Sequence, residues 1–210
     1  MGQIKQLDEG IAELGLDLST DMREKLIAYV ELLFRWNKIY NLTAIREKDE
    51  MVSHHLLDSM AIVPFLWSGR WLDVGCGGGV PGLVLAVLQP EWQFTLLDSN
   101  TKKTSFVQQA TIELGLNNVV IHSGRVENWQ PNNKFDGIIS RAFADMGEFL
   151  SITSHLIAPG GRWAAMKGQP ETELLEITKQ FEIERVIALK VPGLHAARSL
   201  VIAKGSKGAM

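Results

Sequence analysis

The residues best suited to do chemistry form one glycine-rich stretch, Trp71 to Ala86. In it an apolar strand segment leads through closely spaced glycines into an apolar helix segment, and these glycines are Gly75, Gly77 and Gly79. Without a Cβ, such positions let the backbone turn sharply and come close to a ligand. The strict dinucleotide-binding spacing fails, because its last glycine would fall on Val80.

Two carboxylates flank this loop. Asp73 stands two residues before Gly75, and Asp98 follows the predicted strand 92–97. Two like charges about 4 Å apart repel by roughly 4 kcal/mol at an effective dielectric of about 20, so Asp73 favours a cationic ligand over a pyrophosphate. An acidic side chain at the position of Asp98 accepts hydrogen bonds from ribose hydroxyls. S-adenosylmethionine carries a sulfonium, an ammonium group and a ribose, and it meets both conditions.

The pattern Asp-x-Gly-x-Gly-x-Gly followed by a second aspartate resembles the cofactor site of Rossmann-like S-adenosylmethionine-dependent methyltransferases. The resemblance implies S-adenosylmethionine as the cofactor. Val126 and Glu127, after the third predicted strand, lie where an adenine would pack. Two alternatives stay open on these residues alone: a tight strand–helix turn with ordinary surface carboxylates, and a site for a nucleotide or NAD.

Composition narrows the class of protein. With 210 residues, 46% of them hydrophobic, the chain can bury a full core as one domain with an appended subdomain. The net charge of -3 does not favour a general polyanion binder, so a nucleic-acid surface would have to be a local patch. The longest apolar stretch, Val80 to Leu88, is too short to cross a bilayer, and the amino terminus lacks a signal pattern. We expect no membrane association.

The single cysteine, Cys76, excludes a disulfide framework and fits a reducing, cytoplasmic location. It also restricts the reaction. Methylation of a pyrimidine at C5 uses a thiolate that adds to the ring, and the only thiol here lies inside the glycine loop. That reaction is therefore disfavoured.

The order of the elements predicts three regions: an N-terminal helical cap over 1–68, a methyltransferase domain over 69–204 and a disordered tail over 205–210. In the cap we expect helices at 4–14, from Ser19-Thr20-Asp21 onward with Glu24 completing a capping box, and at 51–66. Residues 36–45 read as a structured loop that faces a substrate or is pinned by its own aromatics. His54 and His55 are adjacent, which suits packing or substrate contact and not a metal, so we expect no metal site.

From Arg70 onward strands and helices alternate, which predicts a parallel sheet with helices on both faces. Strands are expected up to Val74 and at 92–97, 119–122, 135–140 and 162–166, with helices at 102–114, 146–157 and 171–180. The helix at 146–157 should stop at Pro159-Gly160-Gly161, and two final runs, 183–191 and 199–203, should pair antiparallel. The expected fold is α/β: a Rossmann-like class I methyltransferase with a seven-stranded, mostly parallel sheet.

Ligands of such sheets lie beyond the carboxyl ends of the strands, next to strand one. That edge collects six of the candidate residues: Gly75, Asp98, Val126, Glu127, Arg141 and Lys167. Methyl transfer from a sulfonium depends largely on holding two atoms at near-attack distance. Methyltransferases of exocyclic amines commonly carry Asn or Asp, Pro-Pro and an aromatic after strand four, whereas this chain has Ser140-Arg141-Ala142-Phe143. Guanine N7 already presents an in-plane lone pair, so its attack requires no catalytic base.

Four cationic side chains could contact RNA: Arg125, Arg141, Lys167 and Arg198. Arg141 could also position the target base, because a guanidinium is a planar group with several donors. The alternative for these residues is salt bridges to Glu127, Asp136 or Glu148 on an exposed edge.

Stretches along nearly the whole chain, including Asn41-Leu42-Thr43, His55-Leu56-Leu57-Asp58-Ser59 and Ser140-Arg141-Ala142-Phe143, make it similar to one family. It resembles the small bacterial guanine-N7 methyltransferases of small-subunit ribosomal RNA, formerly called glucose-inhibited division protein B. The resemblance implies methylation of N7 of one guanine in a conserved loop of 16S ribosomal RNA near the decoding centre.

The resemblance also implies a partner and a cofactor site. The partner is 16S ribosomal RNA or the small ribosomal subunit, and the protein itself is expected to be a monomer. The family's cofactor positions fall on Gly75, Val80, Val126-Glu127 and Arg141. Many members have an acidic residue just before the position of Arg198, whereas this chain has Ala197, so the partner of that arginine is open. Two other functions remain as alternatives: a methyltransferase for a small molecule or a protein, and a non-catalytic, S-adenosylmethionine-dependent RNA-binding assembly factor.

Overall fold

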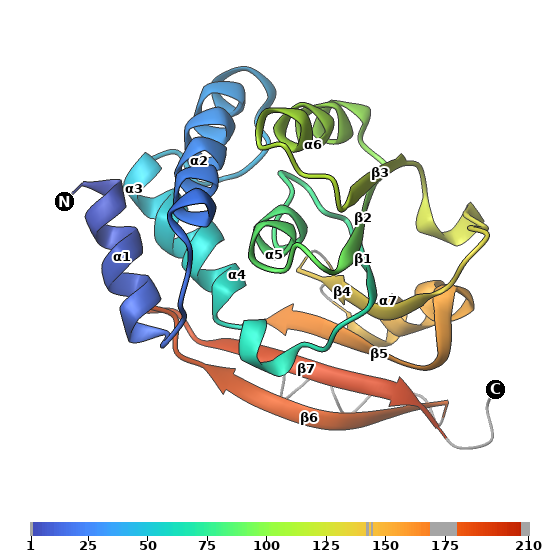
Figure 1. The fold of residues 1–210 in the computed structure, drawn as a ribbon. Coiled ribbons are helices and arrows are strands. Elements are labelled where there is room, and N and C mark those ends of the chain that lie inside the picture. The colour runs from blue at the N-terminus through green and yellow to red at the C-terminus, as the bar shows by residue number, and fades with distance from the viewer. Residues whose placement is uncertain (1, 142, 144, 169–179, 207–210) are drawn as a thin grey trace.

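A seven-stranded sheet forms the centre of the computed structural model, which describes residues 2–141, 143, 145–168 and 180–206 (Figure 1). The strand order is β3-β2-β1-β4-β5-β7-β6. The strands are β1 (Arg70–Val74), β2 (Gln93–Asp98), β3 (Val119–Ser123), β4 (Phe135–Ser140), β5 (Ile157–Lys167), β6 (Phe181–Leu189) and β7 (Arg198–Gly205). Neighbours among β1 to β5 pair parallel, and β7 runs antiparallel to both β5 and β6. The predicted mostly parallel sheet is confirmed.

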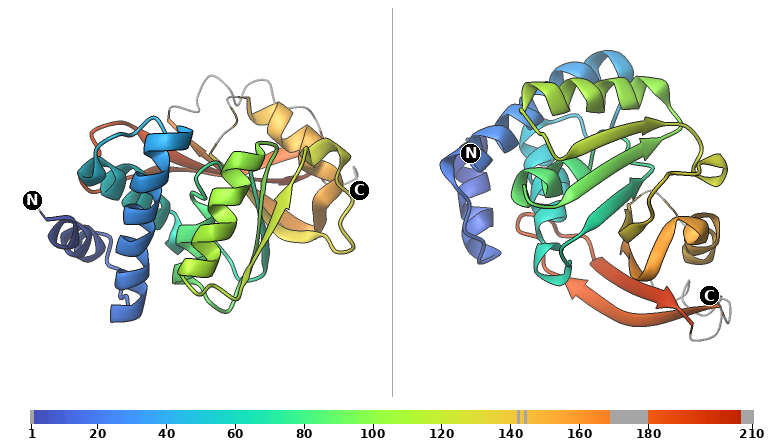
Figure 2. Two further views of the ribbon diagram at one scale, coloured as in Figure 1. Left: turned by 90° about the horizontal axis from the view of Figure 1, so that it is seen from above. Right: turned by 45° about the vertical axis from the view of Figure 1, so that its right-hand side comes forward.

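Alternation along the strands sends side chains to two different cores. Trp71, Leu96 and Ile139 pack into a large core with α5 (Gly82–Leu88) and α6 (Thr101–Glu113). Their sequence neighbours on the same strands pack on the opposite face with α7 (Met146–Thr153), and these are Leu72, Leu97 and Ile138. Helices therefore cover both faces of the sheet (Figure 2).

The N-terminal segments pack on the α5 and α6 side and share its core. They are α1 (Gln3–Glu13), α2 (Thr20–Tyr40), α3 (Lys48–Met51), the π-helix η1 (Val52–Leu57), α4 (Asp58–Met60) and the 3-10 helix η2 (Val63–Phe65). Short 3-10 helices also follow β3 and α7, at η3 (Val126–Asn128) and η4 (Ser154–Leu156). The cap and the sheet therefore share one apolar core beside the glycine loop.

Two expectations for α2 are wrong. Its cap is Ser19, whose hydroxyl accepts from the Met22 amide at 3.2 Å, so no capping box forms between Asp21 and Glu24. Asp21 instead accepts from Lys25 one turn later, at 2.7 Å. The helix also runs on to Tyr40, so the loop that was expected from residue 36 begins only at 41. Aromatic packing keeps the extra turn helical, because Trp36 contacts both Tyr40 and Phe106.

Two strands of the sheet, β5 and β7, are longer than expected. β5 begins at Ile157, so Pro159-Gly160-Gly161 lies within a strand and does not end the preceding helix; that helix gives way to η4 at Ser154. The pairing with β4 shifts register here, and Gly160 has φ +78°. β7 runs through Gly205, and the Ser206 amide donates to Gln180, so the strand includes the start of the expected tail. The helix expected at 171–180 falls almost wholly outside the described residues.

No helix in the described part of the chain is both long enough and apolar enough to cross a membrane.

Candidate active site

The glycine loop is fastened to the end of β2. The amides of Gly75 and Cys76 both donate to the Leu97 carbonyl, at 2.8 and 3.0 Å. The Gly77 amide donates to Asp98 Oδ2 at 3.0 Å, and the other oxygen of Asp98 accepts from the Asn100 amide at 2.8 Å. The three predicted glycines, Gly75, Gly77 and Gly79, have φ values of 71°, 56° and 88°. This left-handed backbone is the reason that the loop requires glycine.

Asp73 lies beneath the glycine loop. It is fully buried, and its Oδ2 accepts from the Gly82 amide at 2.9 Å, where α5 begins. Burial raises the pKa of this carboxyl to about 7, against the opposing effects of the Gly82 hydrogen bond and the Arg141 charge. Asp73 therefore fixes the helix start under the loop. This differs from the expectation that its charge faces a cationic ligand, because position 73 shares a strand face with Trp71, which packs under α5.

Two cavities meet at Gly75. The first, which we call the β2 cavity, has a volume of about 150 Å³ and is lined by Val74, Gly75, Leu97, Asp98, Ser99, Gly124, Arg125, Val126, Glu127, Phe143, Glu148 and Ile152. The second, the cap cavity, has a volume of about 170 Å³ and is lined by Leu33, Leu42, Thr43, His55, Gly75, Cys76, Gly77, Gly78, Val80 and Arg141. Together the two cavities collect the predicted cofactor residues apart from the buried Asp73 and Gly79.

A third cavity is also lined by Arg141. This β7 cleft, of about 240 Å³, is lined by Asp58, Arg141, Met166, Lys167, Gly168 and Arg198. Arg141 borders both the cap cavity and the β7 cleft. Arg141 is therefore the lining residue that the two spaces have in common.

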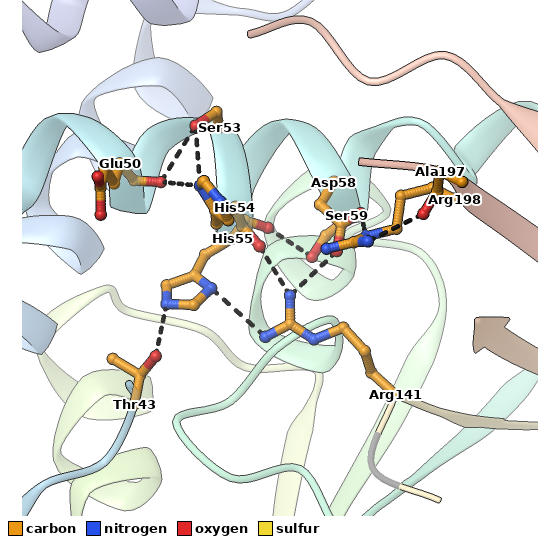
Figure 3. A network of polar contacts seen from close by, with 10 residues as sticks. All are labelled: Thr43, Glu50, Ser53, His54, His55, Asp58, Ser59, Arg141, Ala197 and Arg198. Carbon is orange, nitrogen blue, oxygen red and sulfur yellow. Dashed lines mark hydrogen bonds and ion pairs between the residues drawn. The ribbon is translucent and has the colours of Figure 1, made fainter. Parts of the chain in front are cut away.

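One buried carboxylate holds Arg141 and Arg198 together (Figure 3). Asp58, 1% exposed, accepts from Arg141 Nη1 at 3.1 Å through Oδ2 and from Arg198 Nε at 3.2 Å through Oδ1. Arg198 also donates to the Ala197 carbonyl at 3.0 Å. The open question of the partner of Arg198 is answered by Asp58, a residue of the cap to which the sequence reasoning assigned no role although it lies in one of the quoted motifs.

The π-helix supplies a second hydrogen-bond acceptor for Arg141. At the end of η1 the Asp58 amide donates to the carbonyls of His55 and Ser53 and skips that of His54. Arg141 Nη1 takes up the skipped His54 carbonyl at 2.8 Å. The extra residue in this turn therefore leaves a backbone carbonyl available to Arg141. Such π-helical turns are frequent at functional sites.

His55 completes the set of residues around Arg141. Its Nδ1 lies 3.4 Å from Arg141 Nη2, and its Nε2 lies 3.1 Å from Thr43 Oγ1. Burial, with the Arg141 charge adding to it, lowers the pKa of His55 to about 3, so the ring is neutral at physiological pH. A guanidinium has no acceptor atom, so Nδ1 must accept and Nε2 must carry the proton.

The remaining predicted residues divide into buried and exposed ones. Lys167 is buried, 9% exposed, and its ammonium donates to the Phe143 carbonyl at 2.8 Å. Arg125 and Glu127 are exposed at the edge of the β2 cavity, and Val126 is buried in its wall. Burial raises the pKa of the Cys76 thiol well above its usual value. A buried thiol with a raised pKa is a poor nucleophile.

A family model described as rRNA small subunit methyltransferase G matches residues 22–201 of this chain. The chain belongs to this family. A Ribosomal RNA small subunit methyltransferase G of Laribacter hongkongensis is 52% identical over 198 residues, 94% of this chain and 96% of that protein. Its namesake from Neisseria meningitidis serogroup A is 50% identical over 204 residues, 96% of this chain and 98% of that protein.

Solved structures with much lower identity show the same fold. The glycopeptide N-methyltransferase MtfA, crystallised with S-adenosylmethionine, superposes with a TM-score of 0.59 at 12% identity, over 71% of this chain and 93% of that one. Coclaurine N-methyltransferase gives a TM-score of 0.58 at 15% identity, over 89% of this chain and 67% of that one. The expected Rossmann-like methyltransferase fold of this family member is confirmed.

Proposed function

We propose that this member of the family transfers a methyl group from S-adenosylmethionine to N7 of a guanine in 16S ribosomal RNA of the small subunit. The observation that carries the proposal is a set of three neighbouring cavities, of which the first two share Gly75 and the last two share Arg141. A donor molecule can occupy the first two cavities while an acceptor base approaches from the third. The names of the relatives supply the class of substrate.

The donor atoms around the first two cavities suit S-adenosylmethionine. In the β2 cavity, Asp98 presents a carboxylate at the edge of the sheet for ribose hydroxyls, and Val126 offers an apolar surface for adenine beside Glu127. In the cap cavity, the glycine loop gives close backbone approach and Arg141 gives a positive charge for the methionine carboxylate. When bound, the cofactor supplies an electrophilic methyl group on its sulfonium.

The polar groups around Arg141 are already engaged, which favours an acceptor that loses no proton. Both oxygens of Asp58 accept from guanidinium groups, and the lone pair of neutral His55 faces Arg141. Neither group is free to take a proton from an attacking amine or hydroxyl. Guanine N7 attacks through its own lone pair and needs no such base. We assign Arg141 the role of positioning the base against the donor.

Exposed cations near the cavities are the candidates for phosphate contacts. Arg125 is exposed beside the β2 cavity, and Arg198 is partly exposed in the β7 cleft. Lys167 is a weaker candidate than the sequence indicated, because its ammonium is buried and bonded to Phe143. With a net charge of only -3 and no general excess of cations, such local contacts have to carry the RNA affinity.

Methylation of defined substrates tests the proposal. The protein is incubated with methyl-labelled S-adenosylmethionine and either free 16S ribosomal RNA or small subunits, both from a strain that lacks the modification. We expect label in RNA and a single break after chemistry selective for N7-methylguanine. Label only in protein or small molecules, or at another base position, would contradict the proposal.

The variants Asp98→Ala and Arg198→Ala separate cofactor binding from RNA binding. Asp98→Ala should weaken S-adenosylmethionine binding at least tenfold in calorimetry, because it removes a charged hydrogen-bond acceptor from the β2 cavity. Arg198→Ala should leave cofactor affinity unchanged and raise the KM for RNA. Equal cofactor affinity in Asp98→Ala and the parent protein would count against the placement of the ribose.

A further inference from the structure

Thr43 is a residue of the cap cavity whose hydroxyl oxygen already accepts two hydrogen bonds. It lies on the loop between α2 and α3 and lines the cavity beside His55 and Arg141. The amide of Ile45 donates to its Oγ1 at 3.2 Å. His55 Nε2 lies 3.1 Å from the same oxygen and carries the proton, since Nδ1 faces a guanidinium. Both acceptor positions of the oxygen are therefore occupied.

The hydroxyl proton of Thr43 must then be donated elsewhere. A threonine hydroxyl has one proton and two lone pairs, and both lone pairs are used by Ile45 and His55. Within the described residues, no hydrogen bond shows this hydroxyl as a donor to an acceptor of the chain. The cavity that Thr43 lines is the space into which the proton can point.

The backbone around Thr43 is fixed in place. Asn37, 3% exposed, accepts from the Thr43 amide at 2.9 Å and donates to the Ile45 carbonyl at 3.0 Å. One buried side chain therefore clamps the loop on both sides of the hydroxyl. A donor held in this way needs little reorganisation when a ligand arrives, which makes it suitable for binding a defined group.

We propose that Thr43 donates a hydrogen bond to the α-carboxylate of bound S-adenosylmethionine, next to the guanidinium of Arg141. The proposal rests on the proposed cofactor. The cap cavity offers a hydroxyl proton and a guanidinium, while His55 has its lone pair turned to Arg141, so this end of the cavity presents donors to an acceptor. The carboxylate is the anionic group of the cofactor. With the adenosine part in the β2 cavity, the methionine part extends past Gly75 into the cap cavity.

Calorimetry with two ligands and two variants tests the assignment. Thr43→Val removes the hydroxyl and keeps the shape of the side chain, and Thr43→Ser keeps the donor. The ligands are S-adenosylmethionine and its decarboxylated analogue, and no RNA is present. We expect Thr43→Val to weaken S-adenosylmethionine binding about tenfold, as the loss of a charged hydrogen bond does, and to leave binding of the decarboxylated analogue within twofold. Thr43→Ser should bind both ligands within twofold of the parent protein.

Two outcomes would overturn the proposal. An equal loss for both ligands in Thr43→Val would show that the side chain only shapes the loop. Unchanged cofactor binding with a raised KM for RNA would show that the hydroxyl faces the target base. Thr43→Ala gives the same comparison if the valine variant does not fold, as judged by circular dichroism. The result is independent of the proposed reaction, because these affinities are measured without RNA and the methylation assay at saturating cofactor measures the reaction separately.

Discussion

Two aspartates of the site are buried in different ways. Asp98 has both oxygens bonded to amides, those of Gly77 and Asn100, and borders the β2 cavity. Asp73 has one oxygen on the Gly82 amide, and its other oxygen, Oδ1, has no hydrogen-bond partner within the described residues. An ionised carboxylate in this position is costly, and protonation relieves the cost. This accounts for the raised pKa of Asp73, about 7.

Asp73→Asn should change how stability depends on pH. The native state holds a proton on Asp73 up to about pH 7, whereas the unfolded chain loses it near pH 4. In that window the native state binds more protons at this site, so the contribution of Asp73 to the free energy of unfolding falls as pH rises from about 4 to 7 and levels off above. The total is at most about 4 kcal/mol. The asparagine variant lacks this decline, because its side chain does not titrate.

Urea unfolding at pH 5, 6, 7 and 8 without cofactor measures this effect. The free energy of unfolding of Asp73→Asn minus that of the parent should become more positive with rising pH. Titration of His55, whose pKa of about 3 is lowered by burial, is common to both proteins and cancels in the difference. Parallel curves for the two proteins would contradict the raised pKa of Asp73.

The burial of Asp73 was indicated in the sequence only by the alternation of side chains along β1. Alternation along β1 puts residues 71 and 73 on one face, and Trp71 is a core residue of the α5 side. The motif located the loop between β1 and α5, and the strand phase would have shown which way the side chain of Asp73 faces. Asp98 lies at the β2 cavity as expected, because the sheet edge itself brings it there.

At the scale of elements, the cap depends on close contact between α1 and the π-helix η1. Gly10 of α1 faces Leu57, and a Cβ at this glycine would lie 2.5 Å from both terminal methyl carbons of Leu57. Leu57 is itself buried, 1% exposed. The helix 51–66 was predicted from its spacing, but the π-helical turn within it was not. An extra residue in one turn leaves too little trace in a short apolar pattern.

Gly10→Ala should destabilise the protein although alanine favours helix. The gain in helix propensity is about 1 kcal/mol, whereas forcing an added carbon into a packed contact costs about 1–3 kcal/mol. We expect a net loss of up to about 2 kcal/mol in urea unfolding. Gly2→Ala is the matched control, because no atom lies within 4 Å of a Cβ there. A Gly10→Ala variant as stable as the parent would show that α1 shifts freely on η1.

Across the whole molecule, Asp58 joins three distant segments. It follows η1, Arg141 follows β4 and Arg198 begins β7, and the two pairs are separated by 83 and 140 positions in the chain. Local spacing holds no information about such pairs, which is why the sequence suggested Glu127, Asp136 or Glu148 as partners instead. Helix and strand positions were predictable from periodicity. The contact of Asp58 with both arginines, in contrast, depends on how the cap packs on the edge of the sheet.

Asp58→Ala should lower the free energy of unfolding more than the loss of either Arg141 or Arg198 alone. It leaves two guanidinium groups without their carboxylate, and breaking a buried pair costs about 3–5 kcal/mol. Both arginine side chains are about a quarter exposed, which lowers our expectation to roughly 2–4 kcal/mol. Cofactor affinity should also fall, because Arg141 borders the cap cavity and would lose one of the groups that position it.

A double-mutant cycle separates the interaction energy between Asp58 and Arg198 from the independent effects of the two substitutions. Arg198→Gln in the parent should cost about 1 kcal/mol, and the same change in the Asp58→Ala background should cost less than about 0.5 kcal/mol, because its partner is already gone. Urea unfolding of the four proteins measures the coupling, and calorimetry with S-adenosylmethionine measures the effect on the cofactor site. Strictly additive costs would mean that Asp58 and Arg198 do not interact in solution. In that case the cap would be joined to the sheet edge through Arg141 and the shared apolar core without help from β7.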